Sequence, residues 1–137
     1  MKSIRILSHT SDIRLLIKSN SRHELFRAGI LGLSRIMSVP TKEKKYEIFK
    51  KIRVESIDLT SLFIDMLNEV LSLDHIHKCI FDDIQRLEIY DDKVVEIELR
   101  GYAVSKFSQD VKAVTYHEAD IKHTAVGILQ TIVVLDI

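Results

Sequence analysis

The sequence predicts an α+β fold in which two helices pack on a mainly antiparallel β-sheet within a single domain, residues 1–137. The first observation is size, because 137 residues with 46% hydrophobic and 29% charged side chains suit one domain with one core. The second is periodicity, since two segments repeat their apolar residues at helical spacing and about eight others at strand spacing. The third is connection length, because most of these segments are joined by short polar stretches typical of hairpins.

The first elements are expected to be a pair of strands followed by a helix. Residues 4–7 and 13–18 have strand character, and in the second Ile13, Leu15 and Ile17 share one face. Ser21 is followed three residues later by Glu24, and this capping box predicts a helix from residue 21 to about residue 37. The helix has a wide apolar surface, so we expect it to be buried on most sides.

A strand and a second helix are expected next. Residues 48–54 alternate as a strand does. Asp58 can cap a helix over residues 58–73. Its apolar side chains fall at i, i+3, i+4, i+7, i+8, i+11 and i+12 from Leu59 to Leu71, which predicts one continuous face packed on a sheet.

The C-terminal half is expected to consist of strands. Residues 87–90 and 94–100 flank an Asp-Asp-Lys turn and form a hairpin. Further strands are expected at residues 111–116, 121–124 and 128–135. The last is almost continuously apolar, which predicts an inner strand covered on both faces.

Composition excludes several classes of protein. The 20 Lys and Arg balance the 20 Asp and Glu, whereas a general nucleic-acid coat protein would be strongly basic. Apolar runs are too short for a membrane span. A single cysteine predicts no internal disulfide and a reducing compartment, the cytoplasm. No Gly-rich phosphate-binding motif occurs, and we interpret the basic residues bunched between 42 and 53 as a solvated loop and strand face.

The histidines and the cysteine offer weak candidates for chemistry. His75 and His77 have a spacing that a metal could use, but exposed loop residues are the simpler interpretation. Cys79 could pair with a histidine as a nucleophile, although a buried inert thiol is favoured. His9 and His117 stand at predicted strand ends, where a structural hydrogen-bonding role is the simpler alternative to that of a base.

Carboxylates give a stronger candidate site. Asp12 lies where a polar turn meets a strand, and Asp136 directly follows the apolar strand. Ile137 is expected to carry the free α-carboxylate. If strand pairing brings Asp12 alongside, the crowded carboxylates would repel, protonate or bind a cation. From the residues alone, two solvated surface aspartates remain the simpler interpretation.

Four blocks of sequence resemble the archease family, small accessory proteins of tRNA splicing. They are residues 9–13 (His-Thr-Ser-Asp-Ile), 58–71 (Asp-Leu-Thr-Ser-Leu through Leu71), 112–117 (Lys-Ala-Val-Thr-Tyr-His) and the ending 133–137 (Val-Val-Leu-Asp-Ile). The sequence departs from the family at Met66, where many members have tryptophan, and in the loop 101–109, which lacks the family's Gly-Glu-Pro signature.

The resemblance implies a non-catalytic protein that activates an RtcB-type tRNA-splicing RNA ligase by promoting its guanylylation and multiple turnover. It places a divalent metal, calcium, magnesium or manganese, on Asp12, Asp136 and Ile137. Lys112 corresponds to the family's functional lysine, and His9 and His117 lie within the matching blocks as neighbours of the site. Any RNA would be reached indirectly through the ligase, and no membrane is involved.

Two other classes of function remain open. A chaperone-like binding module would protect unrelated clients, whereas a ligase activator would have one tight partner. A stand-alone metal-dependent hydrolase could use the same carboxylates, but the sequence has no second carboxylate-rich motif, nucleophile context or phosphate loop to support it.

Overall fold

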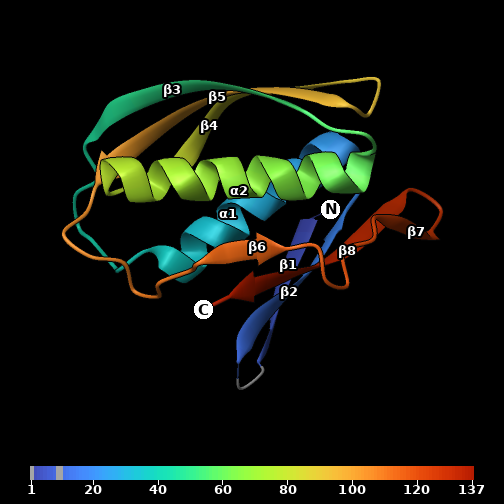
Figure 1. The fold of residues 1–137 in the computed structure, drawn as a ribbon, viewed down its shortest axis with the longest axis horizontal. Helices are drawn as coiled ribbons and strands as arrows, with labels where there is room; N and C mark the ends of the chain where they lie inside the picture. Colours follow the sequence, from blue (N-terminus) through green and yellow to red (C-terminus); the bar gives the residue numbers. More distant parts are fainter. Residues whose placement is uncertain (1, 9–10) are drawn as a thin grey trace.

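The fold is three layers thick, with two α-helices between two antiparallel sheets (Figure 1). The computed structural model describes residues 2–8 and 11–137, and side chains for 3–7 and 11–137. A three-stranded sheet covers one side of the helices and a five-stranded sheet covers the other. The predicted fold class is confirmed. No helix in the described part of the chain is both long and apolar enough to cross a membrane.

Both helices begin at the residues that the sequence indicates. Helix α1 spans Arg22–Met37, and the Ser21 hydroxyl oxygen accepts a hydrogen bond from the Glu24 N–H at 3.2 Å. Helix α2 spans Leu59–His77, and the Asp58 carboxylate accepts one from the Ser61 N–H at 2.8 Å. Each cap satisfies an N–H group that the first turn of a helix leaves without a partner.

Helix α1 lies at the centre of the molecule, in contact with α2 and with strands of both sheets. Nine of its residues are buried, which agrees with the wide apolar surface predicted for it. Gly29 allows α1 and α2 to approach closely, because a Cβ atom there would lie 2.6 Å from a ring carbon of Phe63. Phe63 belongs to the apolar face of α2, whose residues from Leu62 to Leu71 are buried as the periodicity predicts.

The three-stranded sheet has the order β3–β5–β4. These strands span Tyr46–Glu55, Val94–Ala103 and Cys79–Tyr90, respectively. Val95, Ile97 and Leu99 alternate toward the helices and are at most 1% exposed. Asp91 and Asp92 have φ values of 53° and 56°, the left-handed conformation of a tight hairpin turn, so the predicted hairpin forms.

The five-stranded sheet is built around β8, Ile128–Asp136. On one side β8 pairs with β2 (Asp12–Ser19), which in turn pairs with β1 (Lys2–Ser8). On the other it pairs with two short strands, β6 (Ala113–Thr115) and β7 (Lys122–Ala125). The central strand therefore joins the first hairpin to the last third of the chain.

The structure differs from the sequence predictions in four details. The strands form two sheets, whereas we expected one, because strand periodicity does not identify pairing partners. Strand β4 begins at Cys79 rather than near residue 87, and His75 and His77 belong to the last turn of α2 rather than to a loop. Buried and half-buried residues alternate along β8 until Val133–Leu135, so both faces of β8 are fully covered only there.

Candidate functional site

Strands β2 and β8 bring Asp12 and Asp136 side by side. The two residues are direct partners in the antiparallel register, so their side chains leave the sheet on the same face. Directly opposed residues in such a pair have Cβ atoms roughly 4.5–5.5 Å apart. Asp12 is half-buried and Asp136 is exposed. The strand pairing on which the predicted carboxylate cluster depended is therefore present.

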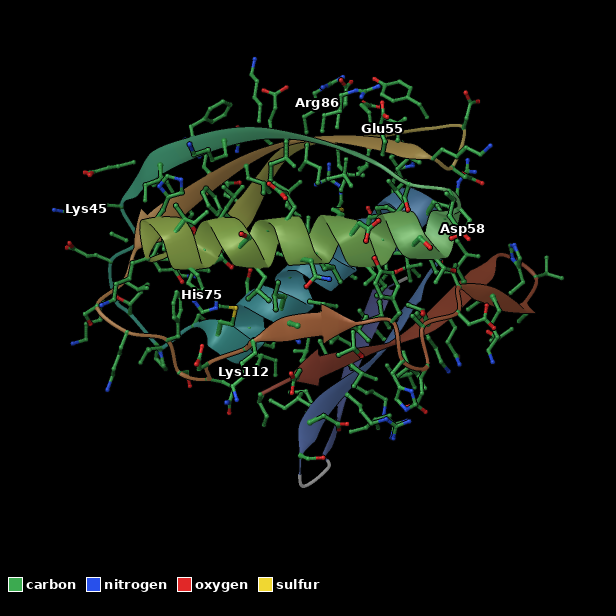
Figure 2. The ribbon with its side chains drawn as sticks, viewed as in Figure 1. Lys45, Glu55, Asp58, His75, Arg86 and Lys112 are labelled. Atoms are coloured by element: carbon green, nitrogen blue, oxygen red, sulfur yellow. The ribbon has the colours of Figure 1, made fainter. Side chains whose placement is uncertain are left out.

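Lys112, the residue before β6, lies along the other edge of β8 at Asp136. Ala113 pairs with Asp136, and the Lys112 backbone N–H donates to the Asp136 carbonyl oxygen at 2.7 Å. The Lys112 side chain is exposed and lies close to the C-terminus of the chain (Figures 1 and 2). Half-buried Ile137 packs against the core, which fixes the main chain beside Asp136.

The chemistry of this row of residues suits a hard divalent cation. Two carboxylates at opposed positions repel in the absence of a cation and offer oxygen ligands in its presence. Among residues 2–8 and 11–137, no three His, Cys, Asp or Glu side chains form a metal-binding group. A cation held by Asp12 and Asp136 would therefore need further oxygen from a main-chain carboxylate or from water. His9 lies outside the described residues.

His117 lies beyond the end of β6 rather than in the row of carboxylates. It is exposed, and its backbone N–H donates to the Thr115 hydroxyl oxygen at 3.3 Å. The next residue, Glu118, forms a bidentate ion pair with Arg14 at 2.8 Å. This pair ties the turn after β6 to β2, so the role of His117 in the described structure is that of a turn residue.

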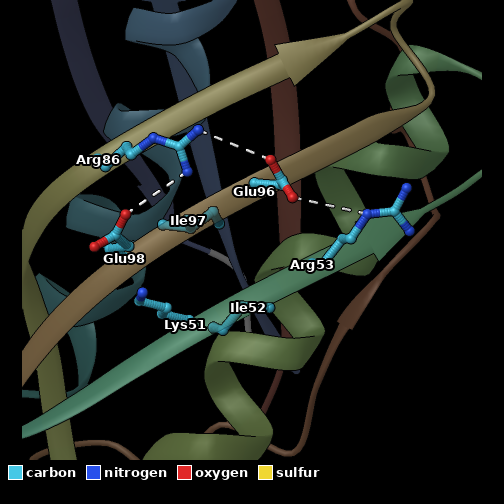
Figure 3. Close-up of a pocket in the computed structure, with 7 residues that line it drawn as sticks. All are labelled: Lys51, Ile52, Arg53, Arg86, Glu96, Ile97 and Glu98. Atoms are coloured by element: carbon cyan, nitrogen blue, oxygen red, sulfur yellow. Dashed lines mark ion pairs between the residues drawn. The ribbon is translucent and has the colours of Figure 1, made fainter.

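The other charged region lies on the outer face of the three-stranded sheet. Arg53 and Arg86 lie on either side of Glu96, and Arg86 also reaches Glu98 (Figure 3). These residues and Lys51 line a shallow pocket of about 290 Å³. Lys51 and Arg53 of β3 stand opposite Glu98 and Glu96 of β5, as expected of the solvated face that we predicted.

Cys79 and His75, near the end of α2, make packing and backbone contacts rather than forming a reactive site. Cys79 is fully buried, and burial raises the pKa of its thiol to about 12, so it is a poor nucleophile. A ring nitrogen of His75 lies 2.9 Å from the Val111 carbonyl oxygen. The prediction of a buried thiol is confirmed, and His75 contacts the backbone.

Sequence reasoning missed two polar residues of α2. Asp74 is fully buried and accepts a hydrogen bond from the Phe81 N–H at 3.1 Å. Burial raises its pKa to about 8, with the charge of Asp82 adding to the effect and the Phe81 hydrogen bond opposing it. Asn68 makes two hydrogen bonds to the backbone of Val114. The only signal in the sequence is a polar residue at the margin of an apolar helical face.

Comparison with known proteins agrees with this architecture. The model of the archease protein family matches residues 5–137. The archease of Pyrococcus furiosus is 36% identical over 129 residues, which cover 87% of each chain.

Two solved structures share the fold at 22% sequence identity. Protein 1598 of Methanobacterium thermoautotrophicum superimposes with a TM-score of 0.81 over 98% of both chains. An archease of Thermotoga maritima, described as a possible chaperone, superimposes with a TM-score of 0.66 over 96% of this chain and 94% of its own.

Proposed function

The chain belongs to the archease family, and from this premise we propose that it activates an RtcB-type RNA ligase during tRNA splicing. In this proposal the protein is not itself a catalyst. It promotes transfer of GMP to the ligase histidine before each round of joining, and so supports multiple turnover.

The opposed pair Asp12 and Asp136 is the observation that supports this proposal. Like charges placed directly opposite each other destabilise a sheet, and here they lie at the end of the central strand pair. The proposed ligands of the divalent cation are these two carboxylates and, in a chain that ends at Ile137, its main-chain carboxylate. Such a set of oxygens suits calcium, magnesium or manganese.

The bound cation would supply positive charge near the triphosphate that the ligase must bind. Asp12 and Asp136 hold that charge at the surface, because Asp136 is exposed and Asp12 only half-buried. Lys112 is exposed, and its backbone N–H is bonded to Asp136, so its side chain would add a positive charge that can face a phosphate or a carboxylate of the ligase. The protein would thus present a bound cation and a lysine side chain to a partner from a fixed edge of its sheet.

A guanylylation assay with the cognate ligase tests the proposal. The ligase is incubated with labelled GTP and a divalent metal, with and without this protein. We expect faster labelling of the ligase and more than one product formed per ligase molecule in its presence. Unchanged labelling and turnover at saturating protein would contradict the proposal.

The same preparation separates the two alternative functions. Incubated with RNA but without ligase, the protein should neither join nor hydrolyse it; phosphoesterase activity that is lost in Asp12→Ala would indicate the hydrolase. Protection of unrelated unfolded proteins from aggregation would indicate the chaperone.

A further inference from the structure

Strand β6, which follows Lys112, is paired with another strand along one edge only. It contains three residues and forms one end of the path β1–β2–β8–β6. Its central residue, Val114, is 2% exposed, so its backbone N–H and C=O groups need partners within the protein. A strand this short, paired along one edge, is weakly held unless another element binds its second edge.

Asn68 of α2 supplies both partners. Its side-chain nitrogen donates to the Val114 carbonyl oxygen at 2.8 Å, and its side-chain oxygen accepts from the Val114 N–H at 2.9 Å. The carboxamide thus reproduces the two hydrogen bonds that one residue of a neighbouring strand would make. Among side chains of this length only asparagine has a donor and an acceptor so arranged, because aspartate lacks the donor when ionised.

Other residues of α2 hold the chain on either side of this contact. A ring nitrogen of His75 lies 2.9 Å from the Val111 carbonyl oxygen, and the Thr60 hydroxyl accepts from the Ile121 N–H at 3.1 Å. Asn68 and His75 are two helical turns apart, which is about 10 Å. Three extended residues, the separation of Val111 and Val114, span about the same distance.

The segment 111–121 therefore runs antiparallel to α2 and is attached to it at three points along the helix (Figure 1). Lys112 lies between two of these attachments. On its other side its own N–H is bonded to the Asp136 carbonyl oxygen. Helix α2 therefore binds one edge of residues 111–114, and strand β8 binds the other edge.

We propose that Asn68 is a positioning residue, whose carboxamide holds the segment carrying Lys112 in register with Asp136. The functional part of this inference rests on the proposed role of Lys112 in ligase activation. The structural part does not, because it concerns only the contact between α2 and β6.

The structural part is tested by amide hydrogen exchange in Asn68→Ala and in the control Glu69→Ala, which changes the next, exposed residue of α2. In Asn68→Ala we expect exchange at Val114 to rise about tenfold or more, with the amide resonances of Lys112 and Asp136 shifted and exchange in the core of α1 unchanged. Glu69→Ala should match the wild type. If Asn68→Ala does not fold, Asn68→Leu, which has a similar size but lacks both the donor and the acceptor, replaces it.

The functional part is tested by a double-mutant cycle in the ligase assay. If Asn68 acts by positioning Lys112, Asn68→Ala should lower activation, and adding it to Lys112→Ala should cause little further loss. Unchanged exchange at Val114 overturns the proposal, and so do losses that simply add. If the wild-type protein fails to stimulate the ligase, the proposed function is wrong. The hydrogen-exchange data still show whether Asn68 holds the backbone of Val114.

Discussion

The two charged regions of the molecule differ in how charges face each other across the strands. On the outer face of β3–β5–β4, Lys51 stands opposite Glu98 and Arg53 opposite Glu96. At the end of the five-stranded sheet Asp12 stands opposite Asp136. The first region places opposite charges together, and the second places like charges together.

This difference separates a charged surface from a candidate site. Opposed unlike charges help to fix strand register and keep a surface soluble at little energetic cost. Even where Glu88 faces Glu96 in the register, two arginines reach Glu96. Opposed carboxylates such as Asp12 and Asp136 are an unfavourable cross-strand pair, and the proposed function gives this pair a role as cation ligands.

The largest expected effect comes from removing the opposed carboxylates. Asp12→Ala or Asp136→Ala should abolish ligase activation and weaken binding of a divalent metal, because a ligand is lost. Without metal the variants should be as stable as the wild type or more stable, since repulsion is relieved. Calorimetric metal titration, thermal melts and the ligase assay measure these effects. Normal metal binding and activation in Asp12→Ala would show that the site is assigned wrongly.

A partial effect is expected at Lys112. Lys112→Ala should reduce ligase activation while metal affinity stays the same or rises slightly, because a cationic side chain does not ligate a cation. Lys51→Ala, on the outer face of the other sheet, is the matched control and should leave activation unchanged. Equal loss in the two variants would mean that only the overall charge matters.

Asp74 extends the comparison to a carboxylate inside the core. Its pKa is raised from 3.8 to about 8 in the folded protein, so the folded state keeps a proton that the unfolded chain loses. The resulting stabilisation is complete below pH 3.8 and is lost as the pH rises through about 8. Asp74→Asn, a neutral isostere, should remove this dependence.

Urea unfolding across this pH range measures the effect. Between about pH 4 and pH 9, the wild type should lose up to about 5 kcal/mol of unfolding free energy relative to Asp74→Asn. Parallel pH profiles for the two proteins would show that Asp74 ionises normally. Asp83→Asn, at an exposed ion pair with Arg100, is the control for a surface carboxylate.

The smallest effect is expected on the outer face of the three-stranded sheet. Glu96→Gln removes ion pairs of 3.8–3.9 Å to Arg53 and Arg86. Exposed pairs of this kind contribute about 1 kcal/mol or less, and salt reduces that further. Unfolding in low and high salt measures the change, and ligase activation should be unaffected. A loss of activation would place part of the ligase interface on this face.

The helices and their caps could be predicted because their signals are local. Ser21 and Asp58 act within three residues of themselves, and the apolar face of α2 depends only on spacing along one helix. The division of the strands into two sheets could not be predicted, because it depends on which strands pair. Alternation identifies the buried face of a strand but not its neighbour.

The candidate site shows the same limit. The sequence places Asp12 at the start of one strand and Asp136 at the end of another, and the pairing of these strands makes them neighbours. Asn68 could not be recognised, because its partner is the backbone of Val114, and any residue type offers the same N–H and C=O groups. The role expected of Lys112 came from family resemblance and not from periodicity.

The central place of β8 has a consequence for folding. Strand β2 lies near the other end of the chain from its partner, so their pairing requires closure of nearly the longest loop available and should be slow. The β4–β5 hairpin and the helices need only short closures and can form earlier. During synthesis β2 presents an unpaired edge until β8 has left the ribosome, and unpaired edges promote aggregation. The yield of folded protein in a cell should therefore depend on how quickly β8 is translated and joins the sheet, as well as on the stability of the finished fold.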